Sequence, residues 1–365
     1  MTDVIAVFNA GSSTLKFSVF HVRDLSLLHQ DTVEVPGAKD GQRVALQTAL
    51  DWFASNKDDL RLCAAGHRIV HGKDRAVSVK ITPEILAELK ELIPLAPLHQ
   101  PHNLWIIEEL AALHSDLPQI ACFDTAFHRT QPKLAAMFAL PRHFYDDGVK
   151  RYGFHGISYE YIASILPKHA GDKAKGRVIV AHLGNGASLC AMKDLKSQAT
   201  SMGFSTLDGL MMGTRCGTLD AGVLLYMQQH LSMSADKVTD ILYHQSGLLG
   251  ASGISADMRT LEQSEAPEAK ETIALFCRMA AQQIGGLMAM LGGLDALVFT
   301  GGIGEHSAQI RQNICAYLTW AGLSLNETRN QSNAVDIHTA NSSASVYVIP
   351  TDEEIVIARA CKAIG

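Results

Sequence analysis

Residues 4–20 read VIAVFNAGSSTLKFSVF. Two runs of β-forming residues, 4–8 and 15–20, flank the polar turn 9–13, and Lys16 lies just after that turn. A plain hairpin requires only two turn residues. This turn carries an amide, a glycine and two hydroxyls, which is more hydrogen-bonding capacity than turning requires. We therefore interpret it as a candidate binding loop between two strands.

A second stretch of the chain has the same layout. Residues 178–192 read VIVAHLGNGASLCAM, again two strand-like runs around a turn of glycine, asparagine and small residues. One interpretation is two unrelated hairpins, because glycine-rich turns are common. The other is a duplicated domain, in which each half of the chain contributes a polar hairpin to a shared cleft.

The composition is that of a folded protein with more than one domain. A length of 365 residues favours two or three domains, and 47% apolar residues suffice for sizeable cores. The net charge of −6 and the lack of a basic run argue against non-specific nucleic-acid binding and against an anionic membrane surface. The 7 cysteines form no C-x-x-C pair and the N-terminus has no signal-peptide pattern, so we expect reduced thiols and a cytoplasmic location.

Strand-like and helix-like segments alternate along the chain, which predicts α/β layers. A helix is expected after Thr82, because Pro83 and Glu84 form a typical helix start. The most hydrophobic region, 284–304, is long enough for a membrane span, but Asp295 and the glycine pairs favour a helix end, a strand and a loop. The further strand-like runs are 120–123, 178–182, 188–192, 296–300 and 346–349, and the further helix-like runs are 102–114 and 269–291.

A third glycine-rich cluster, GGIGE at 301–305, follows a strand-like run. It is similar to a dinucleotide-binding turn, but Ser307 stands where G-x-G-x-x-G requires its last glycine, and no G-x-x-x-x-G-K-[ST] motif occurs in the chain. The backbone N–H groups of such a loop before a helix can bind a nucleotide phosphate or sugar. A structural turn at the start of a helix is the alternative.

Arg68 lies between apolar neighbours in the segment GHRIVHG, residues 66–72. A cation in that context requires an anion as its partner, either a ligand or an acid in a structural salt bridge. The two histidines of the segment lack the glutamate of H-E-x-x-H, so a zinc site is only weakly indicated.

Other segments place polar side chains where ligands bind. Asp124 follows an apolar strand, and the carboxyl ends of strands in α/β sheets face ligand crevices. His155 and Arg215 lie between glycines, which allow close approach of a ligand or form a tight turn. The acids of PTDEE at 350–354 precede an apolar helix, where they suit the helix dipole or bind a metal. Together these groups are what phosphoryl transfer requires: arginines, a histidine, a carboxylate for Mg²⁺ and glycine-rich phosphate loops.

A family resemblance covers nearly the whole chain. The chain resembles the acetate kinase family, within the superfamily that also holds sugar kinases and actin, in segments that occur in this order from residue 9 to 354: NAGSSTLKF, GHRIVHG, APLHQP, FDTAFH, YGFHGIS, HLGNGAS, SMGFSTLDGLMMGTRCG, FTGGIGEHSAQIR and IPTDEE. The resemblance implies two duplicated actin-like, sugar-kinase-like (ribonuclease-H-like) α/β domains with a nucleotide cleft between them, and a homodimer. It places residues 1–127 plus 352–365 in an N-terminal lobe and 128–351 in a C-terminal nucleotide-binding lobe.

The resemblance also implies roles for matching residues. The catalytic residues would be Asp124, His155 and Arg215, and Asn9 and Glu353 would hold Mg²⁺ directly or through water. Arg68 would bind the carboxylate of the substrate, in a pocket with the apolar walls Val70, Leu98 and Phe154. Nucleotide contacts are implied for Lys16 and the Ser12–Ser13 turn, and for His182, Leu183, Gly184, Asn185, Gly186, Asp257, Met258, Arg259, Gly302, Ile303, Gly304, Glu305 and His306.

The implied reaction is reversible Mg²⁺-dependent phosphoryl transfer from ATP to acetate, giving acetyl phosphate and ADP, with Mn²⁺ as a second usable cation. Propionate or another short-chain acid is the nearest alternative substrate. Two alternatives from other classes are a non-catalytic ATP-binding switch, which needs no arginine for a carboxylate, and a nicotinamide-dependent dehydrogenase, whose glycine register fails here. No nucleic acid or membrane is expected as a partner.

The sequence departs from the family pattern at several positions, and two of these departures bear on the predicted substrate and nucleotide contacts. Thr206 stands where the family has a proline of the acyl pocket, which affects the expected preference for acyl length. His306 stands where the family has an asparagine after the segment GIGE, which affects the expected nucleotide contacts.

Overall fold

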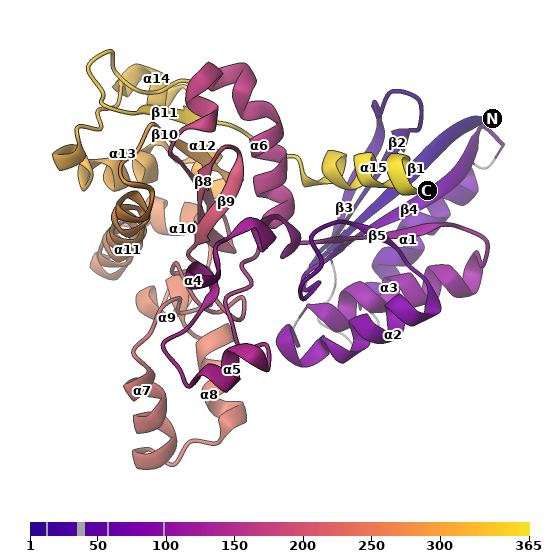
Figure 1. The fold of residues 1–365 in the computed structure, drawn as a ribbon, viewed down its shortest axis with the longest axis horizontal. Coiled ribbons are helices and arrows are strands. Elements are labelled where there is room, and N and C mark those ends of the chain that lie inside the picture. The colour runs from indigo at the N-terminus through magenta and orange to yellow at the C-terminus, as the bar shows by residue number, and fades with distance from the viewer. Residues whose placement is uncertain (12–13, 35–40, 57, 98) are drawn as a thin grey trace. The chain divides into compact units, whose positions relative to one another are not determined.

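The computed structural model describes residues 1–11, 14–34, 41–56, 58–97 and 99–365 of the chain (Figure 1). The chain divides into two compact units. Unit 1 comprises Met1–Arg129, Phe154–Tyr161 and Asp352–Gly365, and unit 2 comprises Thr130–Gly153 and Ile162–Thr351. The sequence predicted residues 154–161 in the second lobe, whereas they group with unit 1. The physical reason is that the Gly156 N–H donates to the Asp124 carbonyl at 2.8 Å and Ile157 packs into the core of unit 1.

The sheet of unit 1 has the strand order β3-β2-β1-β4-β6-β5. An antiparallel meander of β1, β2 and β3 is joined through β1 to the parallel strands β4 and β6, and β5 pairs antiparallel with β6 at the edge. The strands are β1 Thr2–Ala10, β2 Thr14–His21, β3 Leu27–Glu34, β4 Leu60–Ile69, β5 Val79–Lys80 and β6 Gln119–Phe123.

The sheet of unit 2 has the order β11-β10-β7-β8-β9. Its β7, β8 and β9 form an antiparallel meander, and β10 and β11 extend the sheet in parallel from β7. The strands are β7 Val178–Leu183, β8 Ala187–Lys193, β9 Lys196–Thr200, β10 Ala296–Thr300 and β11 Ser345–Val348.

The two sheets share one topology. In each unit the first strand lies at the centre, the second and third follow it as a meander on one side, and the next two long strands lie parallel to it on the other side. The stretches 4–20 and 178–192 form the corresponding hairpins β1–β2 and β7–β8. This repeated topology confirms the α/β fold class and favours the duplicated domain over two unrelated hairpins.

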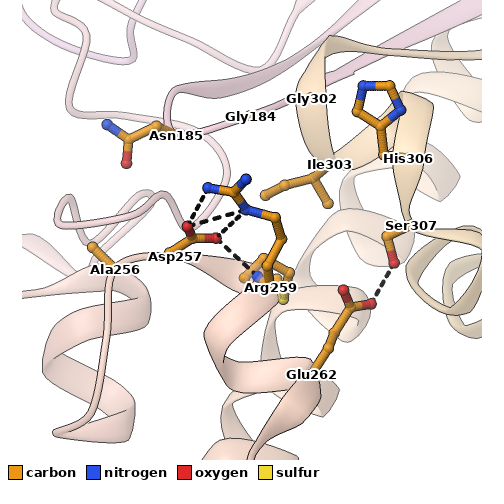
Figure 2. A pocket seen from close by; sticks show the side chains of 11 residues that line it. Gly184, Asn185, Ala256, Asp257, Arg259, Glu262, Gly302, Ile303, His306 and Ser307 are labelled. Carbon is orange, nitrogen blue, oxygen red and sulfur yellow. Dashed lines mark hydrogen bonds and ion pairs between the residues drawn. The ribbon is translucent and has the colours of Figure 1, made fainter. Parts of the chain in front are cut away.

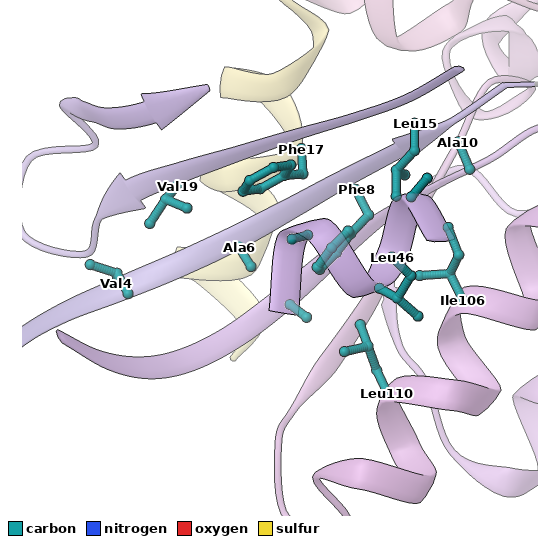
Figure 3. Packing of buried hydrophobic residues seen from close by; sticks show 13 residues of the cluster. Val4, Ala6, Phe8, Ala10, Leu15, Phe17, Val19, Leu46, Ile106 and Leu110 are labelled. Carbon is teal, nitrogen blue, oxygen red and sulfur yellow. The ribbon is translucent and has the colours of Figure 1, made fainter. Parts of the chain in front are cut away.

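Strand β1 shows how helices cover both faces of the first sheet. Successive side chains of a strand point to opposite faces. Val4, Ala6 and Phe8 pack against α1 and α3 (Figure 3), whereas Ile5 and Val7 pack against α15. The helices of unit 1 are α1 Gly41–Ser55, α2 Pro83–Glu91, α3 Gln100–Leu113, α15 Glu353–Ile364, the short η1 Ile93–Leu95 and η2 Ala126–Thr130, and the first turns of α6 Gly156–Ala170.

The central strand β4 was missed from the sequence because Gly66, His67 and Arg68 interrupt its apolar pattern. Glycine is required at 66, since a Cβ there would lie 2.4 Å from Cγ2 of Ile357 and 2.5 Å from Sγ of Cys361, both on α15. The predicted start of α2 is confirmed: the Thr82 hydroxyl accepts the first-turn N–H of Ile85, and Pro83 is the first helical residue.

In unit 2 the long helix α11 (Pro267–Leu291) packs against β7, β8 and β9. Of the helices described by the structure, α11 is the one that is long and apolar enough to span a membrane by length and composition alone. Its face that includes Phe276, Cys277 and Ile284 is buried within the unit, so we interpret it as a core helix. The hydrophobic region 284–304 contains the end of α11 and strand β10, as predicted, and then α12 instead of the expected loop.

The other helices of unit 2 connect its strands and form its outer parts. They are α4 Lys133–Ala136, α5 Arg142–Asp146, the rest of α6, η3 Gly171–Lys175, α7 Ala221–Leu225, η4 Tyr226–His230, α8 Ala235–His244, α9 Gly247–Ser252, α10 Met258–Gln263, α12 Gly301–His306, α13 Ala308–Ala316, η5 Thr319–Ala321 and α14 Glu327–Gln331.

The packing of α15 on the first sheet gives a test of the fold. Ile357 is fully buried against that sheet, whereas Ile364 in the last turn of the same helix is exposed. We expect Ile357→Ala to lower the free energy of unfolding by about 2–5 kcal/mol, because it removes buried methyl groups and leaves a cavity. Ile364→Ala should change it by less than about 0.5 kcal/mol. Urea unfolding followed by circular dichroism measures both; equal effects of the two variants would contradict the packing.

Candidate active site

Unit 1 gathers charged side chains at the carboxyl ends of its central strands. Asn9 lies near the end of β1 and is paired in register with Lys16 on β2. Arg68 lies at the end of β4, and Asp124 directly follows β6. The charged cluster of unit 1, as we call it, consists of Asn9, Lys16, Arg68, Asp124, Glu353 and Glu354. This edge of a sheet is where α/β proteins bind ligands.

The Arg68 guanidinium is held by Asp124. Nη2 of Arg68 lies 2.6 Å from Oδ2 of Asp124, and Nε lies 3.0 Å from Oδ1, which is a bidentate contact. Nη1 donates to Oδ1 of Asn9 at 3.1 Å. Burial works against the charge of Arg68, but the carboxylates of Asp124 and Glu353 outweigh it and raise the pKa of Arg68. The structural salt bridge considered for Arg68 is therefore present.

This arrangement leaves part of the guanidinium available. An arginine has five N–H donors in a planar fork. With the described residues, Asp124 and Asn9 engage the Nε–H and one N–H on each terminal nitrogen. One N–H on Nη1 and one on Nη2 remain for a ligand, and such a pair fits a carboxylate.

Two adjacent glutamates at the start of α15 complete the charged cluster of unit 1. The Asn9 amide donates to Glu353 at 3.2 Å and to Glu354 at 3.1 Å, and Lys16 forms an ion pair with Glu354 at 2.8 Å. Glu354 is 3% exposed. The sequence reasoning did not select it, although a second acid beside Glu353 in an apolar helix is a signal for it, because Asp352 already caps that helix.

The donor set of this cluster fits a hard divalent cation. Burial raises the pKa of Glu353; the neighbouring Glu354 acts in the same direction, whereas Arg68 opposes the shift. A divalent cation would relieve this repulsion, and Mg²⁺ commonly takes one or two carboxylates together with substrate phosphates. The part of the chain that the structure describes contains no group of three or more His, Cys, Asp or Glu residues placed to hold a metal. Asn9 presents its N–H groups to Glu353, so its role as a ligand stays a prediction.

His155 is placed by its backbone next to Asp124. It adopts a left-handed conformation with φ of 57°, which is uncommon for a residue other than glycine. On one side the Gly156 N–H donates to the Asp124 carbonyl at 2.8 Å, and on the other His128 Nε2 lies 2.9 Å from the Phe154 carbonyl oxygen. A Cβ at Gly156 would lie 2.2 Å from that Asp124 carbonyl, so glycine is required there. The residues that follow β6 thus hold His155 next to Asp124.

The other predicted groups of the substrate pocket are partly described. Val70 and Phe154 are buried in unit 1, and the Val70 N–H donates to Asn103. Leu98 and the Ser12–Ser13 turn lie outside the described residues. Arg215 belongs to unit 2, where its Nη1 donates to the Thr206 carbonyl at 2.6 Å.

Unit 2 contains a cavity of about 390 Å³ between its glycine-rich loops (Figure 2). The volume lies within the range of small-molecule sites. The predicted nucleotide-binding residues that line it are Gly184, Asn185, Asp257, Met258, Arg259, Gly302, Ile303 and His306, and the further lining residues are Ala256, Glu262 and Ser307. The sequence reasoning missed Glu262 and Ser307. Their side chains form a hydrogen bond with each other within the wall of the cavity (Figure 2).

The remaining predicted nucleotide residues do not line this cavity. Leu183 and Gly304 are buried behind it, and Glu305 accepts the backbone N–H groups of Gly301 and Thr351. Lys16 lies in unit 1 and pairs with Glu354. The other two are His182, at the end of β7, and Gly186, whose carbonyl accepts from Gly184 at 3.0 Å.

The cavity walls are fixed by local hydrogen bonds. Asp257 caps α10 and holds the Arg259 guanidinium at 2.6 Å, and hydrogen bonds from Arg259 lower the pKa of Asp257. Gly301 has φ of 76°, and a Cβ there would lie 2.8 Å from the Leu183 carbonyl, so the turn from β10 into α12 requires glycine. Gly301 thus makes the turn from β10 into α12, and Gly302 and Ile303 of the same segment line the cavity.

The sheet topology and the cavity together define the class of protein. A duplicated α/β unit with this sheet topology, and a cavity formed by its glycine-rich loops, place the chain among the actin-like and sugar-kinase-like proteins. Within that class the chain belongs to the acetokinase family, whose model matches residues 25–359.

Individual relatives support this membership over the full chain. The chain is 49% identical to an acetate kinase of Rhodopseudomonas palustris over 388 residues, covering 98% of each chain, and 43% identical to one of Rickettsia felis with the same coverage. Among solved structures it is similar to a propionate kinase of Francisella tularensis, with a TM-score of 0.92, 35% identity and 100% coverage of both chains. It is also similar to Porphyromonas gingivalis acetate kinase, with a TM-score of 0.87, 32% identity and 99% coverage of both.

The charged cluster of unit 1 predicts opposite effects for its two glutamates. In buffer without divalent cations at pH 7.5, we expect Glu353→Gln to raise the thermal midpoint, because it removes a carboxylate disfavoured by burial and by Glu354. Glu354→Gln should lower the free energy of unfolding by about 1–2 kcal/mol, less than for a fully buried pair because Lys16 keeps 36% of its side chain exposed. Differential scanning calorimetry compares the two. A Glu354→Gln variant that is more stable than the wild type would contradict the contacts described for the charged cluster of unit 1.

Proposed function

We propose that the protein catalyses reversible phosphoryl transfer between ATP and acetate, giving acetyl phosphate and ADP. Membership of the acetokinase family supports this activity. The single observation that carries it is Arg68, whose guanidinium is fixed by Asp124 at the end of β4 with one N–H on each terminal nitrogen left for a ligand. That pair suits a small carboxylate.

The chemistry requires cations more than a base. A carboxylate is a weak nucleophile and carries the same sign of charge as the γ-phosphate, so the two anions must be held in line at about 3–3.5 Å. Arg68 would hold the acid, and Arg215 and His155 would neutralise the charge that develops on the transferring group. Mg²⁺, when bound, would neutralise charge on the phosphate oxygens, and Glu353 would hold it.

Asp124 acts in this proposal through Arg68. Acetate is already ionised near neutral pH, so no proton has to be removed before it attacks. Both carboxylate oxygens of Asp124 contact the Arg68 guanidinium. We therefore assign Asp124 the role of orienting and balancing Arg68 rather than that of a general base.

Propionate is the second candidate substrate. The chain resembles a solved propionate kinase over its whole length, and Thr206 departs from the family proline. A methylene changes selectivity by only about 1–3 kcal/mol in an apolar pocket. The homodimer stays a prediction from the family resemblance, and analytical ultracentrifugation tests it. The cytoplasmic location stays a prediction from the cysteine pattern and the N-terminal sequence.

An acyl-phosphate assay tests the proposed function. We expect the purified protein with ATP and Mg²⁺ to form hydroxamate-reactive product from acetate, and kcat/KM to fall from acetate to propionate to butyrate by about tenfold or more per methylene. A higher kcat/KM for propionate would assign it as the substrate instead. No acyl phosphate from any of the three acids would refute carboxylate kinase activity.

Replacing Arg68 tests the site within the same assay. We expect Arg68→Ala to lower kcat by about 10²–10³, the scale for losing one charge-stabilising donor. The control is Arg61→Ala, on the same strand, since Arg61 pairs with Asp3 at 2.7 Å on the exposed surface. Steady-state kinetics compare kcat of the two variants. A near-normal kcat for Arg68→Ala would contradict the role of Arg68 in the mechanism.

A further inference from the structure

Arg311 on α13 is the largest of the fully buried side chains in the described part of the protein. It has no exposed surface, and each of its five N–H groups meets an acceptor. Nη1 donates to the carbonyls of Gly304 at 2.9 Å and Glu305 at 3.0 Å. Nε donates to the Asn330 amide oxygen at 2.8 Å, and Nη2 donates to the Asn330 carbonyl at 2.7 Å and to the Asn333 amide oxygen at 2.6 Å. The guanidinium is therefore saturated by the protein itself.

The five acceptors are all neutral, which is unusual for a buried cation. Buried charges are normally paired with an opposite charge. Arg177 in the same unit is paired with an opposite charge, because it binds both carboxylate oxygens of Asp295, although its side chain is 38% exposed. Burial lowers the pKa of Arg311 to about 10, so the group still carries its charge near neutral pH. An arginine is suited to this place because its rigid planar fork can address several fixed acceptors at once.

The acceptors of Arg311 lie directly behind the cavity of unit 2, which is lined by predicted nucleotide-binding residues. Gly304 and Glu305 belong to α12, and the neighbouring residues Gly302, Ile303 and His306 line the cavity. Asn330 and Asn333 belong to α14 and the turn after it. Arg311 thus ties the cavity-lining helix α12 to α14, without lining the cavity itself.

We propose that Arg311 is a positioning residue for nucleotide binding, which holds α12 so that Gly302, Ile303 and His306 meet the nucleotide. The inference rests on the proposed function for the identity of the ligand. A six-residue helix has little stability of its own, so its position depends on contacts to its neighbours. Removing Arg311 leaves the Gly304 and Glu305 carbonyls without these donors and lets α12 shift relative to the other cavity wall.

The test measures ADP binding directly, by isothermal titration calorimetry on the full-length protein. We expect Arg311→Gln to weaken ADP binding by about 3- to 30-fold, the scale for positions that act through others, while the KM for acetate stays within about twofold. Arg311→Lys should behave like Arg311→Gln, because one ammonium group cannot reach both α12 and α14. Full restoration of ADP binding by lysine would overturn the proposed geometry.

Two further variants keep the test decisive. Asn333→Gly removes one of the five hydrogen bonds and suits the backbone, since Asn333 has φ of 51°. It should weaken ADP binding in the same direction and by less, and if Arg311→Gln is insoluble, unchanged binding in Asn333→Gly would overturn the proposal. Arg177→Gln is the control for loss of an arginine of unit 2 that binds Gly292 and Asp295 rather than α12, and an equal loss of ADP binding there would also overturn it.

The outcomes separate this inference from the function on which it rests. A wild-type protein that binds ADP but makes no acyl phosphate would refute the proposed reaction and leave the role of Arg311 testable by the same titrations. A wild-type protein that does not bind ADP would refute both.

Discussion

The contact between Arg68 and Asp124 is the interaction on which the site of unit 1 depends. A guanidinium at the end of a central strand is stabilised there by an opposite charge, because desolvation of an unpaired cation is costly. The neighbouring parallel strand β6 provides that charge in the first residue after it ends, which is Asp124. Parallel pairing brings the two ends to the same edge of the sheet, so the ion pair follows from the topology. Because Arg68 also contacts Asn9, it links three strand ends into one cluster.

The same segment then determines where His155 lies. The carbonyl of Asp124 accepts the Gly156 N–H, and His128, four residues further on, contacts the Phe154 carbonyl. Both sides of His155 are thus held by residues that follow β6, in a left-handed conformation that would otherwise be unfavourable. A strained backbone that is over-determined by its surroundings is typical of a functional position. This also explains why residues 154–161 group with unit 1 although the chain enters unit 2 on either side of them.

Much of the fold could be predicted from local sequence, and much of the site could not. The hairpins at 4–20 and 178–192 show runs of β-formers around polar turns, and both sheets place them at corresponding positions. The strand β4 was missed because Gly66 is required by the close approach of α15 and Arg68 by the ion pair with Asp124, and a local pattern encodes neither contact. Glu354 was missed for a related reason: an acid in the first turn of a helix has a sufficient local explanation in the helix dipole, and only its contacts with Asn9 and Lys16 show more.

Arg68 and Arg311 show how an arginine with donors available to a ligand differs from one whose donors are all used by the protein. Arg68 is charge-balanced by a carboxylate, yet its partners among the described residues occupy only part of its fork, so donors remain for an anion. Arg311 has the opposite arrangement: all five of its donors are used, by neutral acceptors, so no ligand can reach them and its effect must pass through α12. Both residues look alike in sequence, each an arginine beside isoleucine in a mixed apolar segment. The count of unused N–H groups distinguishes them, and that count follows from tertiary contacts that bring residues 9 and 124 to one arginine and residues 304 and 330 to the other.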